Sequence, residues 1–159
     1  LFKPTGLALL TEAYRKVGQV DKGRTVLAEA LQVVHETGER EYEAELHRLK
    51  GELTLQKNRE RATGNGQQGI ITDPQSLPLD SQGEAETCFL KAIEIARRQQ
   101  AKSLELRATT SLAHLWRQQG KHHKARNMLF EIYTWFTEGF AAKDLQEAKM
   151  LLDSLESRV

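Results

Sequence analysis

The sequence has few of the features that mark export, membrane insertion or a strongly charged binding surface. It contains a single cysteine, Cys88, so no disulfide can form within the chain. No apolar run reaches the roughly 18 residues that a membrane span needs, and the chain does not open with a basic segment followed by an apolar one. Lys and Arg total 23 against 22 Asp and Glu, so no overall field attracts nucleic acid or a membrane. These absences predict a cytoplasmic protein.

Proline and glycine are concentrated in one segment. Two of the three prolines, Pro74 and Pro78, lie within residues 58–82 together with several glycines, a composition that cannot continue a helix. We therefore predict a disordered insertion at 58–82. The flanking sequence carries apolar residues at intervals of three or four, which predicts amphipathic helices and a single all-α domain over residues 1–157. A chain of 159 residues is long enough to bury a core of its own.

The clearest pattern is a helix-turn-helix unit at residues 101–137. Its first helix ends in an apolar stripe that includes Trp116, and Gly120 then breaks the pattern before a second helix begins. Small residues, Ala113 and Ala125, stand where the two helices must touch. The spacing places the apolar residues of each helix on one face.

Residues 4–37 repeat this unit. Gly18 is expected to end the first helix in the left-handed conformation, Gly38 to end the second, and Asp21 to cap the second. Six positions of the two units correspond, which is the self-similarity of a repeat architecture. The pairs are Leu10 with Leu112, Tyr14 with Trp116, Gly18 with Gly120, Gly23 with Ala125, Leu27 with Leu129 and Ala30 with Ile132.

A third copy at residues 40–98 carries the insertion between its two helices. Helix is expected to resume at Ser81, which forms a capping box with Glu84. A final helix is expected at 143–157, capped by Asp144 and Glu147, with one apolar face that covers the last unit. The repeated positions are Leu46, Leu49 and Leu53 in the first helix of the third copy, and Ala85, Phe89 and Ala92 in its second.

The units resemble tetratricopeptide (TPR) repeats. The positions that carry the resemblance are Leu112, Ala113, Trp116, Gly120, Ala125 and Leu129, with their counterparts in the other units. The resemblance implies a TPR-like right-handed superhelix of three helix-turn-helix pairs plus a C-terminal capping helix. The step of 39 residues between Leu10 and Leu49, in place of about 34, suggests a diverged form.

Four short runs carry a closer resemblance. Residues 45–53, 85–93, 135–140 and 144–145 are similar to the C-terminal TPR tails of bacterial STAND-type signalling ATPases, which often follow a class III adenylate/guanylate cyclase domain. The resemblance implies a segment of a larger bacterial signalling protein. It implies no catalytic role, because the catalytic motifs of those upstream domains do not occur in this sequence.

Residues with possible chemistry do not form a convincing site. The run 64–69 matches G-x-G-x-x-G, but it does not lie between a predicted strand and a helix, as dinucleotide binding requires. His114, His122 and His123 lie close in sequence, yet no further ligands complete a metal site. No Ser, His and Asp stand in a nucleophile arrangement. We predict no catalytic residue, no metal and no cofactor, and hence no enzyme.

Two smaller features have structural interpretations. Cys88 precedes an apolar position and is expected to be a small buried hydrophobe, with redox sensing as the alternative. Trp135, Phe136 and Phe140 are expected to seat the last helix through burial of their rings. The alternative for these aromatics is an exposed partner or dimer patch.

A candidate binding surface follows from the TPR resemblance. In that family the first helix of each pair lines a concave groove, and the groove positions between the packing residues are rich in basic residues here. Such a groove suits an acidic peptide or a phosphate through charge-assisted hydrogen bonds. The alternative is a solvated helix face whose charges pair with one another. The groove positions are Glu12, Arg15, Lys16, His47, Arg48, Gly51, Arg107, Ser111, His114 and Arg117.

The sequence thus predicts a non-catalytic interaction or regulatory module. Its expected partner is an acidic peptide, another protein or a sister domain of the same chain, with no nucleic acid and no membrane. The competing hypothesis is a structural tail that mediates self-association as a homodimer.

Overall fold

The computed structural model of the chain describes residues 3–63 and 79–157. These residues form seven helices and no strand, which confirms the all-α prediction. The centre of the predicted insertion, 64–78, lies outside the described residues, and so does the G-x-G-x-x-G run. The helices are α1 (Pro4–Lys16), α2 (Val20–Thr37), α3 (Glu43–Thr63), α4 (Leu79–Arg98), α5 (Lys102–Gln118), α6 (His122–Tyr133) and α7 (Lys143–Glu156).

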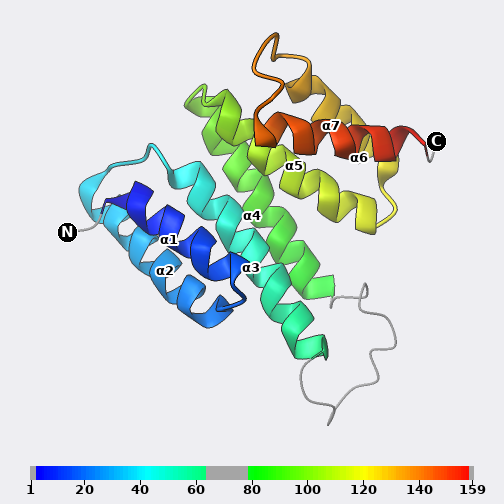
Figure 1. Ribbon diagram of the computed structural model, residues 1–159. Helices are drawn as coiled ribbons and strands as arrows, with labels where there is room; N and C mark the ends of the chain where they lie inside the picture. Colours follow the sequence, from blue (N-terminus) through cyan, green and yellow to red (C-terminus); the bar gives the residue numbers. More distant parts are fainter. Residues whose placement is uncertain (1–2, 64–78, 158–159) are drawn as a thin grey trace.

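The helices form two layers (Figure 1). Helix α1 packs on α2, α3 on α4 and α5 on α6, and each of these pairs is joined to the next. Helices α1, α3, α5 and α7 also contact one another in succession, whereas the described parts of α2, α4 and α6 make no such contacts among themselves. The first set is therefore an inner layer and the second an outer layer, and side chains of the inner layer come together across its surface.

Glycines end helices at the predicted turns. Gly18, Gly38 and Gly120 have φ angles of 76°, 73° and 78°, the left-handed conformation that a residue without Cβ adopts at least cost. At Gly38 the backbone N–H bonds to the carbonyl of Val34, which satisfies one free acceptor at the end of α2.

The capping residues predicted for three helices are wrong. Helices α2, α4 and α7 begin before Asp21, Ser81 and Asp144, which therefore lie in the first turn and are not caps. No side-chain cap hydrogen bond forms at the start of α2 or of α7. Asp21 and Asp144 instead meet cations on neighbouring helices, Lys57 and Arg107. The local sequence predicts that these carboxylates cap their own helices, but in the structure they form ion pairs with other helices.

The limits of the predicted insertion are also too wide. Helix α3 continues to Thr63 and α4 begins at Leu79, so residues 58–63 and 79–82 are helical. Residues 58–63 contain no glycine or proline, and several of them have high helix propensity. The polar composition of residues 58–63 resembles that of a loop, because the apolar stripe of α3 ends before the helix does.

The apolar interior consists of separate clusters. One joins α1 and α2 to Leu46, Leu49 and Leu53 of α3, all at most 1% exposed. A larger cluster contains residues from all five helices from α3 through α7, and it includes Phe89 and Trp116. Among the described residues, no helix has both the length and the apolar character that a membrane crossing requires.

Two of the three aromatic residues before α7 are exposed and not buried as predicted. Trp135 and Phe140 are 57% and 45% exposed, and only Phe136 packs against the core. The Lys102 ammonium lies 5.6 Å from the Trp135 ring centroid. Helix α7 packs on the core mainly through its own leucines. Its buried residues are Leu145, Ala148, Leu151, Leu152 and Leu155.

Candidate functional site

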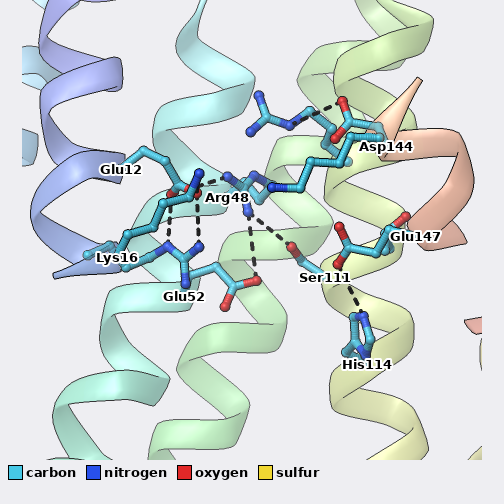
Figure 2. A pocket seen from close by; sticks show the side chains of 12 residues that line it. Glu12, Lys16, Arg48, Glu52, Ser111, His114, Asp144 and Glu147 are labelled. Carbon is cyan, nitrogen blue, oxygen red and sulfur yellow. Dashed lines mark hydrogen bonds and ion pairs between the residues drawn. The ribbon is translucent and has the colours of Figure 1, made fainter. Parts of the chain in front are cut away.

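The inner layer encloses a groove between α1 and α7. Its walls are α1 and α7 and its floor is α3 and α5 (Figure 2). The hollow has a volume of about 230 Å³, and a second hollow of about 240 Å³ shares four residues with it and continues towards Arg59 and Gln118. The lining residues of the first hollow are Glu12, Arg15, Lys16, Arg48, Glu52, Arg107, Thr110, Ser111, His114, Lys143, Asp144 and Glu147.

A buried ion pair forms the floor. Arg48 is 6% exposed and donates two hydrogen bonds to Glu45, from Nε at 3.0 Å and from a terminal nitrogen at 2.7 Å. Its other terminal nitrogen donates to the Ser111 hydroxyl at 3.4 Å. Burial disfavours the charged guanidinium, but Glu45, Glu52 and Glu12 outweigh it and raise the pKa of Arg48. Arg48 is therefore held in place and does not project as a free ligand.

Ion pairs extend from this floor to both walls. Burial would raise the pKa of Glu12, but hydrogen bonds from Arg15 and the nearby charge of Arg48 lower it below the ordinary glutamate value. Positive and negative groups alternate across all four inner helices, so they fix the lateral position of each helix relative to the next. The successive contacts are Arg15–Glu12 at 2.8 Å, Glu12–Arg48 at 3.8 Å, Arg48–Glu45 at 2.7 Å, Glu45–Arg107 at 3.0 Å and Arg107–Asp144 at 3.7 Å.

Two lysines at the rim remain available. Lys16 on α1 is 57% exposed, and its nearest carboxylate, Glu12, lies 3.8 Å away and is already bonded to Arg15. Lys143 on α7 is exposed and forms no ion pair or hydrogen bond with any described residue. The two ammonium groups come from opposite walls, so an anion in the groove could meet both.

The structure gathers seven of the ten candidate residues in the groove. Two of the three exceptions are His47, which is partly buried and close to Glu43, Lys50 and Lys91, and Arg117, which donates to Ser154 of α7 at 3.1 Å. Burial lowers the pKa of His47. Gly51, the further groove position, faces Phe89 of α4. The residues found together are Glu12, Arg15, Lys16, Arg48, Arg107, Ser111 and His114.

The groove is balanced in charge and not basic as predicted. Five Lys or Arg side chains line it beside four Asp or Glu side chains. The missed carboxylates are Glu52 on α3 and Asp144 and Glu147 on α7. The apolar stripe of α7 predicts a cover for the last unit, and it does not reveal that the polar side of this helix faces the groove. The sequence does indicate an acidic side of this helix, because Asp144 and Glu147 lie three residues apart and so share one helix face.

His114 and Glu147 join α5 to α7 at the side of the groove. The Nε2 atom of His114 lies 3.4 Å from a Glu147 oxygen, and both side chains are partly exposed. This hydrogen bond lowers the pKa of Glu147, against a smaller effect of burial. The contact therefore stabilises the position of α7 as long as Glu147 is ionised.

Replacing Glu147 with glutamine is expected to reduce the free energy of unfolding at neutral pH by about 0.5 kcal/mol, a small effect because the pair is exposed. A lowered pKa in the folded state means that the contribution is complete above the ordinary glutamate value of 4.5 and is lost as pH falls through the folded value. Urea unfolding of both proteins from neutral pH to about pH 3 measures the difference. The matched control is Glu138→Gln, an exposed position without a described ion pair. A Glu147→Gln difference that stays constant with pH would contradict this account.

Other candidate chemistry is not assembled in the described residues. They contain no group of three or more side chains that could hold a metal ion. Cys88 is 7% exposed, as predicted, and burial raises the pKa of its thiol, which disfavours the reactive thiolate. The groove brings charged side chains of α1, α3, α5 and α7 together around one hollow.

Comparison with known proteins adds no assignment: the sequence matches no protein-family model, and no curated protein or solved structure shows significant similarity to it.

Proposed function

We propose that the chain is a non-catalytic interaction module of the TPR type that binds a peptide segment in the groove between α1 and α7. The observation that carries the proposal is the convergence of four inner helices on one charged hollow. Three helix pairs followed by α7 support the TPR interpretation. Ser111 bonds to Arg48 and His114 to Glu147, so neither is arranged as a nucleophile with its base.

The ligand of this groove is a peptide with at least one carboxylate. Most of its cations are already paired, which removes the general attraction for acidic chains. The ammonium groups of Lys16 and Lys143 can still donate hydrogen bonds to a ligand. A carboxylate between them gains charge-assisted hydrogen bonds. Glu52 and Glu147 face the same hollow and favour a basic residue next to that carboxylate. A segment of mixed charge therefore fits better than a purely acidic one.

We place the module in a larger bacterial signalling protein, where peptide binding is relayed to other domains. The support for this placement is the similarity of residues 45–53, 85–93 and 135–140 to tails of signalling ATPases. In the structure, the first run lies on α3 and contains Glu45 and Arg48 of the groove floor, and the second lies on the outer helix α4.

Selection of random peptides displayed on phage tests the proposed groove. Peptides that bind the full chain should contain Asp or Glu, and the double variant Lys16→Glu/Lys143→Glu should bind them at least about tenfold more weakly. Both lysines are exposed, so the variant should fold normally. Affinity should also fall with added salt, because the contacts are ionic and close to solvent.

The control has the same change in net charge on the outer layer. Lys22→Glu/Lys91→Glu alters α2 and α4 and leaves the groove intact. Peptides that bind this control and the wild type equally, but not the groove variant, support the assignment. Peptides that bind all three proteins alike, or a selection that yields no peptide dependent on the two lysines, overturn it.

A further inference from the structure

The groove continues from its first hollow into the second along α3 and α5. On both helices, the residues that line only the first hollow precede those that line only the second, so the groove follows the helix axes. Four residues line both hollows and mark their junction. The shared residues are Glu52, Ser111, His114 and Glu147, and the second hollow is completed by Leu55, Arg59, Leu115 and Gln118.

The junction carries two carboxylates that can still accept hydrogen bonds. Glu52 on α3 and Glu147 on α7 lie on either side of Ser111 (Figure 2). Glu52 lies 3.7 Å from Arg48, which is too far for a hydrogen bond. Glu147 meets His114 through one oxygen. Because an ionised carboxylate accepts several hydrogen bonds, both groups can receive a cation from a ligand.

Cationic side chains with few partners lie on both sides of the junction. Lys16 and Lys143 line only the first hollow. Arg59 lines only the second hollow and is exposed, and its hydrogen bond to a described residue is a long one, to Gln118 at 3.5 Å. The charge that a ligand can meet therefore alternates along the groove, from positive through negative to positive.

We propose that the groove recognises a peptide in which an acidic, a basic and a second acidic side chain follow one another in that order. This inference rests on the proposed function, and it assigns a place to each charge of the segment. The first acidic side chain lies between Lys16 and Lys143. The basic side chain lies at the junction, between Glu52 and Glu147. The second acidic side chain meets Arg59 at the far end of the second hollow.

The second hollow also suits the shape of a long basic side chain. Leu55 and Leu115 line it and are only 5% and 2% exposed. The aliphatic stem of a lysine or arginine can cover these leucines while its charged end reaches the carboxylates of the junction. An acidic side chain in the same place would face two carboxylates, so like-charge repulsion excludes the reverse order.

Helix geometry sets the spacing of the three charges. Arg48 lines the first hollow, and along the axis of α3 Glu52 lies about 6 Å and Arg59 about 16 Å beyond it. An extended peptide advances about 3.3 Å per residue, so the basic residue should lie about two positions from the first acid and about three from the second. The expected segment is Glu-Ala-Lys-Ala-Ala-Glu, or the same order in the opposite chain direction.

Peptides of identical composition but different order test the inference. Acetylated and amidated Glu-Ala-Lys-Ala-Ala-Glu and its reverse have the expected order, whereas Lys-Ala-Glu-Ala-Ala-Glu and Glu-Ala-Glu-Ala-Ala-Lys do not. All four carry the same net charge, so general attraction cannot distinguish them. NMR titration of the isotope-labelled full chain measures even weak affinities. The better of the first two peptides should bind at least about tenfold more tightly than either of the others.

Charge reversal at the far end of the groove provides the second test. Wild type should prefer Glu-Ala-Lys-Ala-Ala-Glu, or its reverse, over the same peptide with lysine in place of the acid three positions from the central lysine. Arg59→Glu should invert this preference. The matched control is Arg61→Glu, which changes an exposed arginine of the same helix that lines neither hollow and should keep the wild-type preference.

The outcomes separate this inference from the proposed function. Equal affinities for all four peptides, no binding of the expected order, or an unchanged preference in Arg59→Glu would each overturn the charge order. The proposed function would still stand if peptides selected on the full chain depend on Lys16 and Lys143. Loss of that dependence would overturn both.

Discussion

Replacing Gly51 with alanine is expected to destabilise the protein by about 2 kcal/mol, although alanine is the better helix former. A Cβ at this position of α3 would lie 2.5 Å from Cε1 and 2.9 Å from Cδ1 of Phe89. Phe89 is fully buried at 0% exposure, so its ring has no free space into which it can move. Overpacking of this kind typically costs about 1–3 kcal/mol and exceeds the gain in helix propensity of about 1 kcal/mol. Urea unfolding measures the change.

The matched control is Gly83→Ala on α4. Nothing lies within 4 Å of a Cβ built on Gly83, so alanine there should stabilise the helix by about 0.5–1 kcal/mol. The same substitution is thus expected to lower the free energy of unfolding at one helical position and to raise it at the other. A Gly51→Ala protein as stable as Gly83→Ala would show that α3 and α4 can separate without loss.

A double-mutant cycle identifies the cause. In a Phe89→Leu background, which shortens the side chain opposite Gly51, the added methyl group of Gly51→Ala should be nearly neutral. The two single effects should therefore not add, with a coupling energy of about 1–2 kcal/mol. Additive effects would assign the instability of Gly51→Ala to α3 itself and not to its contact with Phe89.

The position of Gly51 shows what helical periodicity does not determine. The repeat pattern correctly predicted helices on both sides of it, because apolar residues at helical spacing must share a face and be buried. The rotation of α3 about its own axis is set by contacts with α2, α4 and α5 together, which a single helix does not encode. A glycine assigned to the groove therefore lies under an aromatic ring of the neighbouring helix.

Most of the predicted groove residues line one hollow, but the hollow does not have the predicted excess of positive charge. First-helix positions were identified from the alignment of the three units, and most of the basic side chains found there do line the hollow. The carboxylates of α7 and of the buried Glu45 also belong to this network of ion pairs, but they do not occupy the aligned positions of the repeat units. Ion pairing between segments far apart in sequence depends on distances of a few ångströms, and helical periodicity carries no information about them.

Replacing Arg48 with methionine is expected to destabilise the protein by about 3 kcal/mol, because it leaves the carboxylate of Glu45 buried without its main partner. Glu45 is 4% exposed and accepts two hydrogen bonds from Arg48. Arg107 still approaches Glu45 at 3.0 Å, so the loss should lie near the lower end of the roughly 3–5 kcal/mol typical of broken buried pairs. Methionine keeps the length of the side chain, which limits the contribution of a cavity.

The comparison variant is Arg126→Met, which removes a similar arginine from an exposed pair. Arg126 lies 3.1 Å from Glu156 between α6 and α7, and both side chains are at least one-third exposed to solvent. Its loss should cost less than about 1 kcal/mol. The contrast between the two variants measures the effect of burial on the same kind of ion pair.

Removing both charges of the floor separates stability from binding. In Arg48→Met/Glu45→Leu no unpaired carboxylate remains, and apolar replacement of a buried pair is often neutral or stabilising. The double variant should therefore recover most of the stability lost in Arg48→Met, while Lys16 and Lys143 stay in place at the rim.

If the buried pair serves mainly to align the inner helices, peptides selected on the wild type should bind the stable double variant more weakly. Full recovery of both stability and peptide affinity would instead mean that apolar packing alone positions the groove. A double variant no more stable than Arg48→Met would show that the cost lies in lost packing and not in the isolated charge of Glu45.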